Sequence, residues 1–127
     1  MGNEETKKPP FVRGTLDELA ASHPEYKNWF IGHFVKDETF KNSDFEIKWS
    51  NLKKGFCEKK PRMVSPAQTL GILVKGKITM TYPDLGVEET FDTTGDYWSY
   101  NATETSHMTT VHEDTLLLTV RWPSKRK

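Results

Sequence analysis

One histidine is the residue of this chain whose type and position are best suited to chemistry. His107 comes after a Gly95-Asp96 turn signal and a short aromatic stretch, and it precedes the apolar run Thr115–Trp122. These segments predict two halves of a small β-barrel, with the histidine directed to its interior. An imidazole that titrates near neutrality can form hydrogen bonds with a ligand or act as a general base. An imidazole without function, satisfied by Ser and Thr neighbours, is the alternative.

Three aromatic side chains could form the wall of a binding site. Trp98 and Tyr100 alternate after the turn and should face the same side of a strand. Trp49 belongs to an alternating stretch whose apolar positions, Phe45, Ile47 and Trp49, are expected to point inward. A stacking wall for a sugar or another ring is one interpretation, and ordinary core packing is the other.

The remaining histidines do not form an obvious second site. His33 lies in an apolar stretch and is expected to be a structural residue, whereas His112 adjoins two acidic residues that suggest an exposed turn. A metal site drawn from His33, His107 and His112 is disfavoured, because His107 and His112 point to opposite faces of a regular strand.

Composition excludes several classes of partner. The 18 basic residues balance the 18 acidic ones, so we expect no nucleic acid and no membrane surface as partner. The single cysteine, Cys57, rules out an internal disulfide and favours a reducing, cytoplasmic location. No apolar run has the length of a membrane span, and the N-terminus has no signal-peptide pattern.

The chain of 127 residues divides into a leader, one domain and a tail. Residues 1–12 are expected to be a flexible leader, residues 13–124 a single barrel domain, and residues 125–127 a basic tail. Within the domain, Thr15-Leu16-Asp17-Glu18 has the spacing of a capping box and predicts a short helix through Ala21.

Strand signals fill the rest of the domain. Residues 45–50, 70–74 and 77–82 have the alternating or apolar patterns of strands. Turn signals separate them, among them Lys75-Gly76 and His112-Glu113-Asp114. Short strands with a single helix predict an all-β sandwich or closed barrel.

Two segments resemble the sequence motifs of the cupin superfamily. Residues 73–78 resemble the strand–Gly–strand hairpin of the first cupin motif. Gly95-Asp96-Tyr97-Trp98 with Ser106-His107, followed by residues 113–117, resembles the second motif and the strand after it. The match covers residues 60–122 and implies a jelly-roll barrel, the double-stranded β-helix of cupins, with a short N-terminal helix added.

A narrower resemblance concerns the two ends of the domain. Asn28–Phe34 and Leu118–Ser124 are similar to a small, uncharacterised family of single-domain bacterial cupins, sometimes mislabelled as signal peptidases. A peptidase activity has no support, since the chain offers no convincing Ser/Lys dyad. The resemblance also implies a homodimer, with residues 30–35 and 116–120 as candidates for pairing or packing across a two-fold axis.

The usual cupin ligands are missing from this sequence. Cupins hold a divalent metal with a His-x-His pair and a Glu from the first motif and a His from the second. Here Thr69 takes the place of the Glu, the pair falls within Arg62–Ser65, and only His107 remains. The resemblance therefore implies no metal and no other cofactor. Arg62, Gln68 and Thr69 would instead offer a cation, an amide and a hydroxyl, and the arginine would favour a carboxylate or phosphate. Alternatively, Arg62 is a surface charge.

Three hypotheses about function follow. The first is an uncharacterised, non-enzymatic or weakly catalytic cupin-like protein that binds an unidentified small molecule in a metal-free pocket. That pocket would be lined by His107, Thr69, Gln68, Arg62, Trp98, Tyr100 and Trp49. The second is a metal-independent isomerase, epimerase or lyase in which His107 is the base. The third, a dioxygenase-like metalloenzyme with unorthodox ligands, is disfavoured by the missing Glu and His-x-His.

Overall fold

The computed structural model describes residues 8–58, 67–101 and 105–124. Its elements in chain order are α1 (Leu16–Ala21), the 3₁₀ turn η2 (Pro24–Tyr26), β1 (Trp29–Ile31), β2 (Glu46–Leu52), β3 (Gln68–Tyr82), the 3₁₀ turn η3 (Pro83–Leu85), β4 (Val87–Phe91), β5 (Tyr97–Asn101) and β6 (Met108–Trp122). None of the helices in this part of the chain is long and apolar enough to cross a membrane.

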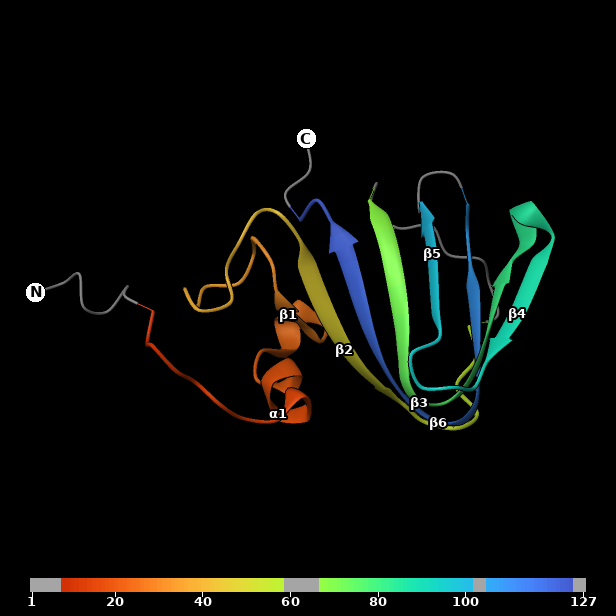
Figure 1. Cartoon of the computed structure of the whole chain (residues 1–127), viewed down its shortest axis with the longest axis horizontal. Helices are drawn as coiled ribbons and strands as arrows, with labels where there is room; N and C mark the ends of the chain where they lie inside the picture. Colours follow the sequence, from red (N-terminus) through yellow and green to blue (C-terminus); the bar gives the residue numbers. More distant parts are fainter. Residues whose placement is uncertain (1–7, 59–66, 102–104, 125–127) are drawn as a thin grey trace, which may run out of the picture.

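The strands form two facing layers that share their two longest members. Within the antiparallel order β1-β2-β6-β3-β4, β5 pairs with the first half of β3. The second half of β6 lies between β2 and the first half of β3, whereas its first half pairs with the second half of β3 beside β4. Figure 1 shows the two layers diverging from the bend of β3 and β6. The predicted all-β jelly roll with one N-terminal helix is confirmed.

Both long strands bend at one place without a break. The expected turns at Lys75-Gly76 and at residues 112–114 are wrong, because β3 and β6 continue through them with shifts in register. Gly76 has a φ of +114°, and a Cβ there would lie 2.4 Å from Thr115 Oγ1. That hydroxyl donates to Glu113 O and accepts from Lys77 N. The glycine therefore allows the two bends to pack together.

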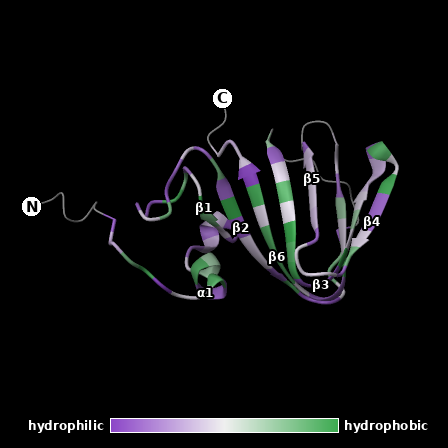
Figure 2. Cartoon of the chain, in the orientation of Figure 1, coloured by the Kyte–Doolittle hydropathy of each residue, from purple (hydrophilic) through white to green (hydrophobic). Residues whose placement is uncertain are grey.

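Apolar side chains are buried in two places: between the two layers, and on the outer face of the layer that contains β1 and β2. The inner cluster consists of Leu73, Ile78, Met80, Tyr82, Trp98, Val111 and Leu117. The outer cluster is built on Ala20, Phe30 and Trp49, with Leu16 and Leu19 of α1 packed against it. Figure 2 shows apolar and polar positions alternating along β2, β6 and β3, as expected for strands whose two faces differ.

Helix α1 covers the outer face of β2. The side chains of β2 that pack against the helix therefore point away from the barrel interior. Thr15 accepts a hydrogen bond from Glu18 N, so the predicted helix cap is present. Asp17 accepts one from Trp49 Nε1 at 2.8 Å. The expectation that Ile47 and Trp49 point into the barrel is wrong. The apolar face of the helix needs a partner, and the outward apolar face of β2 supplies it.

One of the two strands expected at a dimer interface is not available for pairing. Residues 116–120 lie in β6 and are already paired with β2 on one side and β3 on the other. By contrast, β1, which holds part of residues 30–35, lies at an edge of the sheet. The homodimer stays a prediction, with the β1 edge as the candidate for pairing and residues 116–120 as a candidate for packing only.

Candidate functional site

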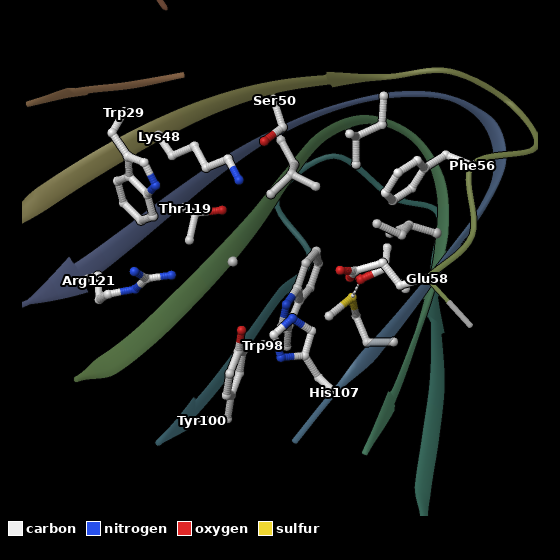
Figure 3. Close-up of a pocket in the computed structure, with 16 residues that line it drawn as sticks. Trp29, Lys48, Ser50, Phe56, Glu58, Trp98, Tyr100, His107, Thr119 and Arg121 are labelled. Carbon is white, nitrogen blue, oxygen red and sulfur yellow. Dashed lines mark hydrogen bonds between the residues drawn. The ribbon is translucent and has the colours of Figure 1, made fainter. Parts of the chain in front are cut away.

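A cavity of about 500 Å³ lies between the two layers. Side chains from both layers surround it, and Figure 3 draws them as sticks. The lining residues are Trp29, Lys48, Ser50, Leu52, Phe56, Glu58, Gly71, Ile78, Met80, Trp98, Tyr100, His107, Thr109, Leu117, Thr119 and Arg121.

One wall of the cavity is a single row of paired residues across five strands. In order, the row is Trp29, Lys48, Thr119, Gly71 and Trp98, each the register partner of the next. Since all five line the cavity, the strand register alone brings two indoles, an ammonium and a hydroxyl onto one surface. The glycine leaves room between them.

The neighbouring row places an arginine beside this wall. Its members are Glu46, Arg121, Thr69 and Tyr100, again as successive register partners. The guanidinium of Arg121 lies over the Trp29 ring at 4.4 Å, and its Nη1 is 4.0 Å from Glu46 Oε1. Lys48 Nζ lies 5.8 Å from the centre of the same indole. Trp29 thus carries two cations over its ring.

His107 lies at the other end of the cavity, beside two tyrosines. Its ring centre is 5.2 Å from that of Tyr100 and 6.3 Å from that of Tyr82. His107 is half-buried rather than mostly buried, because it lies just before β6 with its side chain at the open cavity. Burial raises the pKa of the Tyr82 phenol, and the nearby Tyr100 adds to the shift. Tyr82 is therefore protonated at neutral pH.

The segment after β2 adds a carboxylate. Residues 56–58 pair through their backbone with the first half of β6, since Val111 N donates to Phe56 O and Glu58 N donates to Thr109 O. Figure 3 shows Glu58 and His107 reaching the cavity from one end and Lys48 and Arg121 from the other. The cavity is therefore cationic at one end and offers a carboxylate and an imidazole at the opposite end.

The structure brings some of the expected site residues together and separates others. His107, Trp98 and Tyr100 line the cavity. Thr69 is on the inward face of β3 between Arg121 and Tyr100, but at 1% exposure it lies beneath the cavity surface.

Two expected site residues lie on the outside instead, and one cannot be placed. Gln68 precedes the inward Thr69, so it faces outward, where its Nε2 donates to Ser99 Oγ. Trp49 faces α1, as described above. Arg62 lies outside the described residues.

The charged residues of the cavity were not among the predicted site residues, because the sequence holds only an indirect signal for them. Trp29 and Arg121 belong to the two end segments, 28–34 and 118–124, that carry the narrower family resemblance. Strand β2 lies between these segments, but their ends meet: His33 N donates to Ser124 Oγ, and His33 Nδ1 lies 2.8 Å from the same oxygen. That contact gives His33 the structural role expected of it.

The described residues of this site do not fit the metal centre of a typical cupin. Only His107 and Glu58 among the cavity residues have side chains of the usual ligand types. In the described part of the chain, no three His, Cys, Asp or Glu side chains cluster closely enough to hold a metal ion.

This arrangement of two layers around a cavity is the fold of the cupins. The chain is similar to a cupin protein from Bacteroides fragilis, with a TM-score of 0.57 at 12% identity over 71% of this chain and 75% of the other. It is similar to KdgF from Halomonas sp., with a TM-score of 0.56 at 17% identity over 66% and 74%. A protein from Neisseria meningitidis matches 87% of this chain and 99% of its own, with a TM-score of 0.58 at 14% identity.

The likeness is one of fold. No protein-family model matches the sequence, and no curated protein matches it either.

Proposed function

We propose that this protein binds a small organic molecule in the cavity without the help of a metal. The observation that supports this is the row from Trp29 to Trp98, which lines a cavity of about 500 Å³ with aromatic and polar groups together. Small-molecule sites are typically cavities of this size in which aromatic side chains are combined with convergent polar groups.

In this proposal His107 orients the ligand through a hydrogen bond. The half-buried imidazole lies beside the Tyr100 ring, and the indole of Trp98 forms the adjacent wall. Aromatic faces would hold a ring or sugar by stacking, while the imidazole selects its polar edge.

A fragment screen followed by amide chemical shifts tests this proposal. A bound fragment should shift the amides of Gly71 and Thr119, which lie in the cavity wall. His107→Ala should weaken that binding at least tenfold while changing the thermal midpoint by only a few degrees. His23→Ala, at an exposed position, is the control. Fragments that never shift the wall amides, or a His107→Ala variant that binds normally, would contradict the proposal.

Proton transfer is the second candidate function, favoured by the approach of Tyr100 to His107. An isomerase or epimerase needs a base and an acid near one carbon atom. Here the His107 imidazole would take a proton from a carbon next to a carbonyl while the neighbouring Tyr100 phenol gives one to the carbonyl oxygen. The imidazolium would then return its proton to the former carbonyl carbon as the phenolate takes one from the adjacent hydroxyl, which completes an isomerisation on one face of the substrate.

Isotope exchange separates this candidate from simple binding. A ligand found in the screen is incubated with the protein in D₂O, and the mass of the ligand is then measured by mass spectrometry. Incorporation of deuterium that depends on both His107 and Tyr100 supports catalysis. Tight binding without incorporation assigns the cavity to binding alone.

A further inference from the structure

We infer that the ligand of this cavity is an organic carboxylate, received by Lys48 and Arg121 at the Trp29 end. The inference rests on the proposed binding function and names the chemical class of the ligand.

The two cations are adjacent because of the strand register. Lys48 on β2 is opposite Thr119 on β6, and Arg121 lies two residues further along β6 on the same face. Diagonal positions of this kind on neighbouring strands are within reach of long side chains. Figure 3 shows both side chains directed from their strands into the cavity. An anion between them would meet an ammonium and a guanidinium at once.

Arg121 is held in an orientation that suits a carboxylate. The Trp29 ring lies against the guanidinium at 4.4 Å, and the buried Glu46 attracts it from 4.0 Å. At that distance the two opposite charges attract each other. A guanidinium has a planar fork of N–H donors that matches a carboxylate with two parallel bonds.

The charges at the two ends of the cavity determine how the ligand is oriented in it. Among the described lining residues, the formally charged side chains are Lys48 and Arg121 at one end and Glu58 at the other. Glu46, against Arg121, offsets one of the two cations, and the other leaves this end with a positive charge, so a carboxylate is attracted to the first end and repelled from the second. The remainder of the ligand then extends along Trp98 toward His107 and Glu58, where a hydroxyl or carbonyl group can form hydrogen bonds. A short hydroxy or keto acid has this pattern.

Benzoate and benzamide form a matched pair of probes, because they have nearly the same shape and differ in charge. Binding to the whole protein is measured by amide chemical shifts at low ionic strength. We expect benzoate to bind at least tenfold more tightly than benzamide, and added salt to weaken benzoate alone.

Variants assign the preference to the two cations. Lys48→Gln should lower the affinity for benzoate about tenfold and leave benzamide unchanged. Lys75→Gln, the same change at an exposed position outside the cavity, should alter neither. Arg121→Gln leaves the buried Glu46 without this cation and can impair folding. The double variant Glu46→Gln/Arg121→Gln removes both charges and should show the same loss of benzoate binding.

The outcomes distinguish the two proposals. If benzamide binds in the cavity as tightly as benzoate, or if Lys48→Gln leaves the benzoate affinity intact, the inference of a carboxylate ligand is overturned while the binding function stands. If neither probe shifts the amides of the cavity wall up to its solubility, the carboxylate inference falls. The fragment screen then decides the binding function by itself.

Discussion

The indole of Trp98 lies directly on the backbone of Gly71, its register partner on the neighbouring strand. A Cβ on Gly71 would be 2.3 Å from Cε2 of the indole and 2.5 Å from Nε1. The indole of Trp98 also stacks on Phe91, with ring centres 4.5 Å apart. Because the indole packs against both of these neighbours, the shape of the cavity wall depends on the absence of one methyl group.

Gly71→Ala should therefore move Trp98 and destabilise the protein. An added methyl group in a packed interior costs about 1–3 kcal/mol, because neighbouring groups must shift. Denaturant unfolding measures that cost, and the fluorescence of the protein should change as the indole moves. Gly14→Ala is the control, since nothing lies within 4 Å of its Cβ position. Equal stability of the two variants would show that Trp98 can adjust without cost.

The fold was predictable because its signals are local. The Thr15 cap, the alternation in β2 and the two motif segments each lie within a few residues of sequence. The bends were misread for the same reason. A glycine at position 76 signals a turn locally, whereas its contact with Thr115 on the partner strand decides that the chain bends and continues as a strand.

The candidate site was predictable only in part, because most of it depends on register between distant strands. Trp98, Tyr100 and His107 are close in sequence, so one segment revealed them. Lys48 and Arg121 meet only through the pairing of β2 with β6. The face of β2 was assigned wrongly because both of its faces are covered, one by α1 and one by the facing layer.

Asp84 is predicted to hold the segment that leads into His107. Both the backbone N and the Oγ of Ser106 donate to Asp84 Oδ2, at 3.1 and 3.0 Å. Asp84→Ala removes both bonds and should cost about 1 kcal/mol, since the carboxylate is largely exposed. Hydrogen exchange at residues 106–109 should accelerate. Asp44→Ala, at another exposed loop position, is the control, and unchanged exchange in Asp84→Ala would rule out this anchoring role.

Protonation of Asp17 in acid should weaken the attachment of helix α1 to the sheet. The hydrogen bond from Trp49 lowers the pKa of the Asp17 carboxyl, and a second one from Asn51 lowers it further. An aspartate with a lowered folded-state pKa stabilises the protein fully above its unfolded pKa of about 3.9. That contribution disappears as the pH falls through the lower, folded-state value.

Tryptophan fluorescence and thermal unfolding across the acid range measure this effect. In Asp17→Asn, the amide oxygen can still accept from Trp49 but has no charge to lose. The variant should be less stable than the parent protein at neutral pH, and the difference should vanish at low pH. A difference that persists unchanged at low pH would refute the assignment to Asp17.

Tyr82→Phe is predicted to leave the protein as stable as before or to stabilise it. The side chain is 6% exposed, and no group among the described residues forms a hydrogen bond with its buried hydroxyl. Removing a buried hydroxyl that has no partner removes a desolvation cost, so a gain of about 0–1 kcal/mol is expected.

The stability advantage of Tyr82→Phe over the parent protein should grow in alkali. Burial and Tyr100 raise the pKa of the folded-state phenol above its usual value of about 10. As the pH rises beyond that value, the unfolded state ionises first and the parent protein loses stability. Denaturant unfolding at neutral and alkaline pH measures both effects, with Tyr97→Phe at an exposed position as the control. A clear loss of stability in Tyr82→Phe at neutral pH would show that its hydroxyl has a bonding partner in solution.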